Sequence, residues 1–157
     1  MDVEVQLKVQ ELLARYIQAI DDDRLEAWPD FFTEQCRYLV TTVENVEQKL
    51  PLGLIYATSR AMLRDRVRSL REANVYEAQR YRHVIGPPLI EEAEGGSVRA
   101  RTNFIVARIM HTGETMIFAT GHYNDRIVLT ATGGARFAEK VVILDSRQID
   151  TLLAIPL

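Results

Sequence analysis

The sequence predicts an α+β domain spanning residues 1–157, in which three N-terminal helices pack into a strongly curved, mostly antiparallel sheet. Helical periodicity dominates the first part of the chain, and long β-branched segments separated by Gly-containing turns follow residue 79. Apolar residues make up 47% of the chain, enough for one core at this length. Helices packed into such a sheet form a cone, which can enclose a pocket.

The first predicted helix covers residues 3–20, where apolar side chains recur at helical spacing. The acidic triplet at 21–23 ends this helix and offers an N-cap for a short second helix within RLEAWPDFF, residues 24–32. Trp28 on this second helix is expected in the core, beside the Phe pair that follows it.

Ser59 is expected to cap the third helix, at residues 60–73. Its inner face is predicted to carry Met62, Leu63, Val67 and Leu70.

The strands are predicted from β-branched and aromatic runs between turn signals. They cover residues 36–43, 80–86, 88–94, 97–110, 115–130 and 135–146. Residues 44–58 are expected to form a long loop, because they contain Pro51 and Gly53. The alternation of apolar side chains slips within 97–110, which predicts a bulge or burial on both faces.

Composition excludes several functional classes. A net charge of −3 argues against general nucleic-acid binding, and no apolar run reaches the ~18–20 residues of a membrane span. The acidic, amphipathic start does not resemble a signal peptide, so the cytoplasm is the expected compartment.

Metal chemistry is not expected in this chain. A Rieske cluster needs two Cys and two His, but Cys36 is the only cysteine and is expected to be a buried apolar residue. The three histidines have no spacing typical of an iron triad, and His111 falls in a predicted turn, where solvent would surround it.

The segment YRHVIGPPLI at residues 81–90 carries the strongest candidate for catalysis. His83, an Asp of the triplet such as Asp22, and a tyrosine (Tyr16, Tyr38 or Tyr56) would make a general acid–base site if all three faced the cone pocket. The same residues also fit a structural role, with a hydrogen-bonded His at a sheet edge or subunit contact and an acidic helix cap. Tyr81 and His83 are expected to share one face of the strand, and Arg82 the other.

Arginine supplies sixteen of the nineteen basic residues, a choice typical of paired and interface cations. Arg60, Arg64, Arg68 and Arg71 form one stripe on the third helix, either a solvated face or a docking face for an acidic partner. The interface candidates are Tyr81, Arg82, His83, Arg64 and Arg68.

Four segments together resemble the small (β) subunits of Rieske-type aromatic-ring-hydroxylating dioxygenases. They are AWPDFFTEQCRYLV, MLRDRVRSLREANVYEAQRYRHVIG, RIMHTGETMIFATGHYNDRI and DSRQIDTLLAIPL. The resemblance covers essentially the whole chain in order. It is strongest to the branch that acts on aromatic acids, such as the terephthalate dioxygenase and salicylate hydroxylase small subunits.

This resemblance implies a nuclear-transport-factor-2-like (SnoaL-like) cone without catalytic residues. It implies a homotrimer within a hexamer of three large (α) and three β subunits. The α subunits would hold the Rieske [2Fe-2S] cluster, the non-haem Fe(II) and the substrate, with electrons from NAD(P)H. The alternatives are a stand-alone dehydratase or isomerase, which requires an open pocket at His83, and a ligand-binding module, which requires a cavity without the His–Asp pair.

Overall fold

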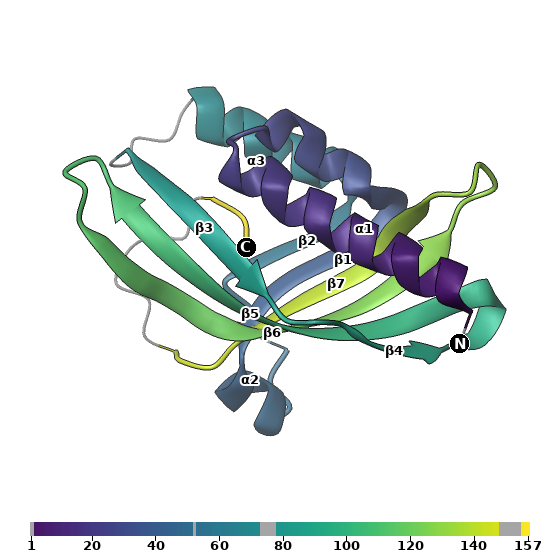
Figure 1. The fold of residues 1–157 in the computed structure, drawn as a ribbon. Coiled ribbons are helices and arrows are strands. Elements are labelled where there is room, and N and C mark those ends of the chain that lie inside the picture. The colour runs from purple at the N-terminus through teal and green to yellow at the C-terminus, as the bar shows by residue number, and fades with distance from the viewer. Residues whose placement is uncertain (1, 52, 73–77, 148–154) are drawn as a thin grey trace.

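One curved, mixed sheet organises the computed structural model, which describes residues 2–51, 53–72, 78–147 and 155–157 (Figure 1). Six strands follow the order β2-β1-β7-β6-β5-β3, and β4 pairs with β5 beside this path. β1 and β7 are parallel, whereas the other neighbouring pairs are antiparallel. The predicted α+β layout with a mostly antiparallel sheet is confirmed.

The first half of the chain contains more short helices and strands than predicted. Their bounds are α1 Val3–Asp21, η1 Leu25–Phe31, β1 Phe32–Thr42, α2 Val43–Glu47, β2 Ile55–Ser59, α3 Arg60–Glu72, β3 Gln79–Ile85, β4 Leu89–Glu92, η2 Glu94–Gly96, β5 Ser97–Met110, β6 Thr115–Leu129 and β7 Ala135–Leu144. The elements η1 and η2 are 3₁₀ helices, and the other helices are α-helical.

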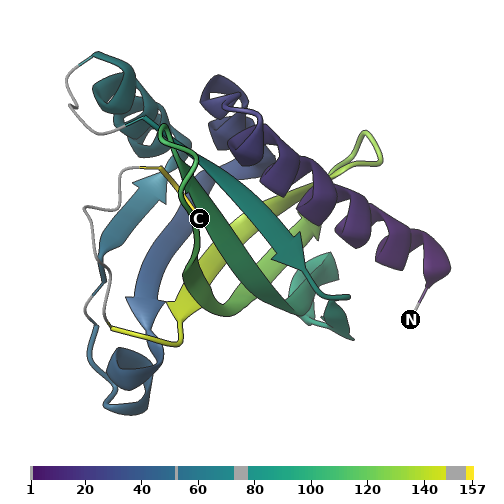
Figure 2. The same ribbon diagram turned by 60° about the vertical axis from the view of Figure 1, so that its left-hand side comes forward.

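The helices α1 and α3 lie on the same face of the sheet, here called the inner face (Figures 1 and 2). Each turns an apolar stripe toward the core, as the helical spacing predicts. The buried stripes comprise Val9, Leu12, Leu13, Tyr16, Ile17 and Ile20 in α1, and Leu63, Val67 and Leu70 in α3. None of the described helices is long and apolar enough to cross a membrane.

Two predictions about α3 have different outcomes. The Ser59 hydroxyl accepts a hydrogen bond from the Met62 backbone N–H over 3.2 Å, so the predicted cap is confirmed. Met62 itself is 43% exposed, and its predicted place on the inner face is wrong. Its sulfur instead accepts a hydrogen bond from the Thr58 hydroxyl, at the edge strand that precedes the helix.

The predicted loop at 44–58 is wrong, because it contains α2 and β2. The Thr42 hydroxyl accepts from the Asn45 N–H over 3.2 Å and so begins α2 directly after β1. β2 then pairs antiparallel with β1, with Ile55 and Ala57 buried. A strand of five residues carries too short an alternation for sequence reasoning to find.

The acidic triplet ends α1 as predicted, but it does not cap the next helix. Asp22 is the C-cap of α1, and Asp23 has a φ of 56° in the left-handed region. The N-cap of η1 is Arg24, without a side-chain cap bond. The register of β5 and β6 shifts between Val106 and Ala107, but the extra residue is Phe118 on β6, so the bulge predicted within 97–110 lies on the neighbouring strand.

Aromatic side chains fill the space between the helices and the sheet. Trp28 is fully buried, as predicted, and packs edge-on against Phe32 and Tyr38 at centroid distances of 5.8 and 5.2 Å. Phe104 and Tyr123 stack at 4.6 Å on the inner face of β5 and β6. Such edge-on and stacked contacts stabilise a core beyond the burial of its apolar area.

An ion pair lies within this aromatic core. Lys140 and Asp125 are cross-strand partners on β7 and β6, and Lys140 Nζ lies 3.1 and 3.2 Å from the two Asp125 carboxylate oxygens. Both side chains are inaccessible to solvent. The same Nζ lies over the rings of Tyr16, Tyr123 and Phe137, at 4.6, 3.6 and 4.3 Å from their centroids. The rings therefore add cation–π attraction to the charge pair.

Burial opposes the charged form of both partners. Loss of hydration raises the pKa of Asp125 to about 6, although the Lys140 charge opposes this rise. Loss of hydration also lowers the pKa of Lys140 to about 8, against the opposing attraction of Asp125. The pair is therefore charged on both sides only within a narrow range around neutral pH.

Removal of one partner should destabilise the fold far more than removal of both. Lys140→Met or Asp125→Leu alone leaves a buried, unpaired charge, and each should lower the free energy of unfolding by about 3–5 kcal/mol. The double variant should be as stable as the parent chain or more stable, because no charge remains buried. Denaturant titration of the four proteins measures this cycle. Additive losses from the two single changes would contradict it.

The pair should also give the stability curve a distinct pH dependence. Asp125 binds its proton more tightly in the folded chain, so its contribution to stability should fall as pH rises from about 4 to about 6. Lys140 releases its proton more easily in the folded chain, so its contribution should rise from about pH 8 to about 10. The measurement compares the unfolding free energy of the parent with that of the Lys140→Met, Asp125→Leu double variant across pH. The parent should be least stable relative to the double variant between pH 6 and 8. A flat difference would contradict this assignment.

Candidate functional site

A buried histidine–aspartate pair joins β3 to the end of α1. His83 Nδ1 lies 2.6 Å from Asp21 Oδ1, and the His83 backbone N–H donates to Asp21 Oδ2 over 2.8 Å. A carboxylate only accepts hydrogen bonds, so the contact places the ring proton on Nδ1. The pair fastens the C-terminal end of α1 to the sheet.

The acid in this pair is Asp21, so the prediction of Asp22 is wrong. Asp22 points to solvent and lies 3.6 Å from Arg24 as an exposed ion pair. The helix explains the difference, since α1 ends at Asp21 with that side chain still on the inward face. One residue further, at Asp22, the side chain has rotated away from β3.

Both side chains of the pair are almost completely buried. The side chains of His83 and Asp21 are 0% and 2% exposed, and His83 Nε2 is buried without a hydrogen-bond partner among the described residues. A hollow of about 590 Å³ lies beside the end of α1, lined in part by Asp21–Asp23 and Ala78–Arg82, but His83 is not among its described lining residues.

The candidate Tyr16 is engaged elsewhere in the cone. Its hydroxyl donates to the Leu157 carbonyl over 2.7 Å and accepts from Trp28 Nε1 over 3.2 Å. Tyr38 donates to the same carbonyl over 3.1 Å and accepts from the Leu157 N–H. Burial raises the pKa of Tyr38 to about 12 and that of Tyr16 well above its usual value, so both hydroxyls keep their protons.

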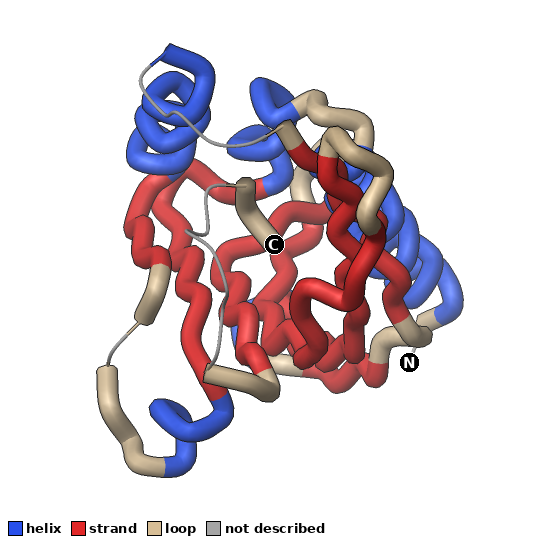
Figure 3. Tube along the Cα trace, turned by 90° about the vertical axis from the view of Figure 1, so that its left-hand side faces the viewer, coloured by secondary structure: helices blue, strands red, loops and turns tan. Residues whose placement is uncertain are grey.

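The segment Ile155–Leu157 therefore fills the space where a cone pocket would lie. It enters between the sheet and the helices, and its three residues are buried (Figures 1 and 3). The predicted carboxylate–imidazole pair forms, but Tyr16 belongs to a separate set of hydrogen bonds. This arrangement can hold elements together and offers no access for a substrate to His83.

The alternation predicted for β3 is confirmed. Tyr81 and His83 face inward and are each 4% exposed, whereas Arg82 faces outward. Tyr81 stacks on Phe118 at 5.2 Å and contacts His83 at 6.2 Å. The prediction that Tyr81 and His83 lie at an interface is wrong, because both are buried within their own chain. Arg82 is the exposed interface candidate on this strand.

The three histidines differ in their exposure to solvent. His83 is buried, the turn residue His111 is exposed, and His122 is half-buried on the sheet. Burial, reinforced by the Arg101 charge, lowers the pKa of His122. Within the described part of the chain, no group of three His, Cys, Asp or Glu side chains could hold a metal ion. Cys36 is buried as predicted.

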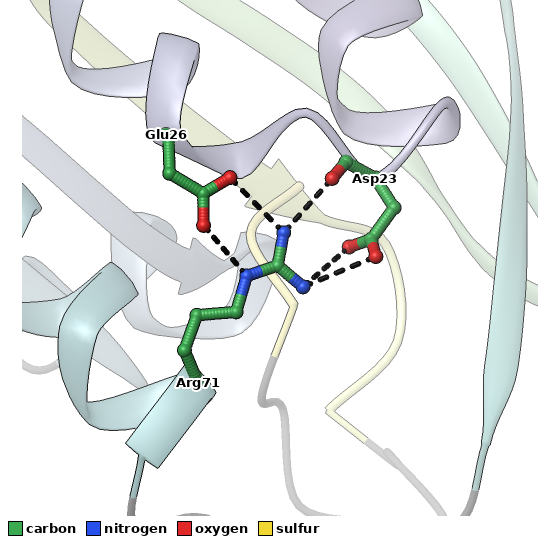
Figure 4. A network of polar contacts seen from close by, with 3 residues as sticks. All are labelled: Asp23, Glu26 and Arg71. Atoms are coloured by element: carbon green, nitrogen blue, oxygen red, sulfur yellow. Dashed lines mark hydrogen bonds and ion pairs between the residues drawn. The ribbon is translucent and has the colours of Figure 1, made fainter.

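Most arginines of the α3 stripe bind the chain's own acidic and carbonyl groups. The Arg71 guanidinium contacts the carboxylates of Glu26 and Asp23, with Nε 2.8 Å from Glu26 Oε1 and Nη1 3.0 Å from Asp23 Oδ1 (Figure 4). Arg60 donates to the Phe32 carbonyl, and Arg64 lies 3.6 Å from Asp30.

The acidic partner that the stripe suggested is therefore largely the segment 23–32 of this same chain. Among the described residues, Arg68 pairs only within its own helix, at 3.6 Å from Asp65. Of the interface candidates on α3, Arg64 and Arg68 remain more than half exposed.

The opposite, outer face of the sheet carries a second set of arginines. Arg99 and Arg101 on β5 and Arg126 on β6 point outward, while their sequence neighbours point into the core. Apolar side chains are also exposed on this face at Val84 and Ile105. Sequence reasoning missed this surface, although the alternation in VRART was a signal that two arginines share one face.

Comparison with known proteins places this fold in one family. The family model described as "Ring hydroxylating beta subunit" matches residues 15–151. Subunit beta 2 of the terephthalate 1,2-dioxygenase terminal oxygenase component from Comamonas sp is 45% identical over 152 residues, which cover 97% of this chain and 98% of that protein. The small subunit of anthranilate 1,2-dioxygenase from Burkholderia cepacia is 39% identical over 156 residues, 99% of this chain and 96% of that protein.

Solved structures agree with this assignment. A beta subunit assigned to an aromatic-ring-hydroxylating dioxygenase of Novosphingobium aromaticivorans superposes with a TM-score of 0.89 at 39% identity, covering 98% of this chain and 97% of that one. ActVI-ORFA from Streptomyces coelicolor, at 17% identity and a TM-score of 0.71 over 90% of this chain and 98% of that one, shares the fold alone. The chain therefore belongs to the family of ring-hydroxylating dioxygenase β subunits.

Proposed function

We propose that this chain is the structural β subunit of a cytoplasmic oxygenase and assembles with a large α subunit that carries out the chemistry. The observation that carries the proposal is the burial of the polar groups inside the cone. Ile155–Leu157 are buried inside the cone, and the side chains of His83 and Asp21 are only 0% and 2% exposed. A member of an oxygenase family with such an interior contributes through its surface.

The metal-binding side chains available in this chain agree with a structural role. A Rieske cluster needs two cysteines, and the sequence contains one, so the cluster belongs on the α subunit. In the proposed complex the α subunit also holds the non-haem iron, and electrons would arrive from NAD(P)H through separate reductase proteins. No step of the reaction is assigned to a residue of this chain.

The relatives support a class of substrate for the complex. Terephthalate and anthranilate, for which two relatives are named, are both benzene rings that carry carboxylates. We propose that the complex hydroxylates an aromatic carboxylic acid.

A homotrimer of this chain, within a hexamer of three α and three β subunits, is the proposed assembly. The exposed apolar side chains of the outer face support contacts between copies, since stable interfaces between copies are more apolar than the remaining surface. Val84, Ile105 and Ile117 are 62, 46 and 65% exposed and lie on the adjacent strands β3, β5 and β6.

The assembly can be measured directly. Co-expressed with its large subunit, the chain should elute as one species with the mass of three α and three β subunits, and light scattering should confirm that mass. The chain alone should give the mass of three copies. If the two chains elute separately at micromolar concentration, the structural role proposed here is wrong.

Changes at His83 should affect stability and leave turnover intact. His83→Phe leaves Asp21 buried without its partner and should lower the unfolding free energy by about 1–3 kcal/mol. The assembled oxygenase should keep its turnover of an aromatic acid within about twofold, measured by oxygen uptake at a temperature where the variant stays folded.

His111→Gln, in the exposed turn, is the matched histidine control and should change neither property. A hundredfold loss of turnover in the folded His83→Phe complex would show that His83 takes part in the chemistry.

A further inference from the structure

The arginines of this chain divide into two groups after folding. Those of α3 bind acceptors within the chain, as shown for Arg71. On the outer face of the sheet, five arginines have no hydrogen bond or ion pair with any residue that the structure describes: Arg80, Arg82, Arg99, Arg101 and Arg126. Cations left without internal partners are the ones available to another molecule.

Three of these five arginines are grouped by the sheet register. Arg99 and Arg126 lie directly opposite one another on β5 and β6, and Arg101 follows two residues along β5 on the same face. Like charges directly opposite one another on a sheet face destabilise it. The fold of the isolated chain therefore gains nothing from this pairing, whereas a carboxylate placed between the two guanidinium groups would offset their repulsion.

The three arginines surround a hollow of about 340 Å³, whose lining also includes Leu89 and Asn124. Leu89 on β4 is 65% exposed, so an apolar side chain stands beside the cations. An apolar anchor beside arginines that a partner would cover is typical of the energetically important part of an interface.

Two glutamates also lie at the hollow, but they do not neutralise it. Glu139 lies opposite Arg126 in the register, but its ion pair is with Arg37 on β1, with Nη1 3.0 Å from Oε1. Glu91 is the cross-strand neighbour of Arg99 on β4, and no ion pair joins their described side chains. Asp125, the third carboxylate of the lining, is paired with Lys140 in the core. Three arginines therefore meet a single carboxylate, Glu91, that has no ion pair among the described residues, so the hollow is cationic.

We propose that this hollow, formed by Arg99, Arg101, Arg126 and Leu89, binds a carboxylate-bearing segment of the large subunit. The proposal rests on the proposed function and names the surface that recognises that partner. The planar fork of arginine pairs with carboxylates in a bidentate manner, which gives both orientation and specificity. The apolar side chains around Ile105 suit contacts between copies of this chain, and the arginine hollow suits a different, acidic partner.

The test compares charge variants of the full-length chain in binding to its large subunit. Arg99→Glu combined with Arg126→Glu should weaken binding by about 30-fold or more, because loss of a buried charge pair at an interface costs a few kcal/mol. Arg99→Lys combined with Arg126→Lys should give a smaller loss, since the charge stays and the fork is lost. Binding of the glutamate variant should also depend less on salt than binding of the parent.

Arg68→Glu combined with Arg64→Glu on α3 is the matched control, because it reverses two exposed arginines outside the hollow. This control should bind the large subunit as the parent does. Circular dichroism and the unfolding midpoint of each variant show whether it is folded, and the lysine variant keeps the test decisive if the glutamate variant is not.

The outcomes separate the two proposals. If the parent binds and both hollow variants bind equally well, the hollow is not the docking site, and the proposed function stands. If the parent does not bind its large subunit at all, the proposed function fails and this inference fails with it. If the hollow variants change the mass of the chain alone and leave binding to the large subunit unaltered, the hollow is a contact between copies, which overturns the inference.

Discussion

The hydrogen bonds from Tyr16 and Tyr38 to the Leu157 carbonyl determine what this fold can do. They hold an apolar segment of the chain in the middle of the cone, where a pocket would otherwise lie. Both hydroxyls remain donors because burial raises the pKa of each tyrosine. With the interior filled, the remaining places for recognition are the surfaces of the sheet and the helices.

The polar groups inside the cone serve to join elements. Asp21 and His83 tie α1 to β3, and Lys140 and Asp125 tie β7 to β6. Each pair joins two different elements, and each would leave a costly unpaired group if one partner were lost. A histidine–aspartate contact of catalytic appearance is thus explained by assembly of the fold, because geometry alone does not make a site without access.

Sequence reasoning recovered what periodicity controls and missed what long-range register controls. The helices α1 and α3 and the alternation of Tyr81 and Arg82 follow from local patterns. The choice of Asp21 over Asp22 depends on a rotation of one residue at a helix end. The enclosure of Lys140 with Asp125 depends on the exact register in which β6 pairs with β7, which the strand pattern alone does not define.

Long-range contacts also explain why the arginine stripe of α3 is a poor candidate for a docking surface. Its spacing made a visible stripe, but the stripe meets Asp23, Glu26 and Asp30 once the chain folds. Arg99 and Arg126 are far apart in sequence and become neighbours only through the β5–β6 register. Arginine content therefore says little about binding until internal pairs are removed, and the cations that remain unpaired after folding mark the surface that a partner would recognise.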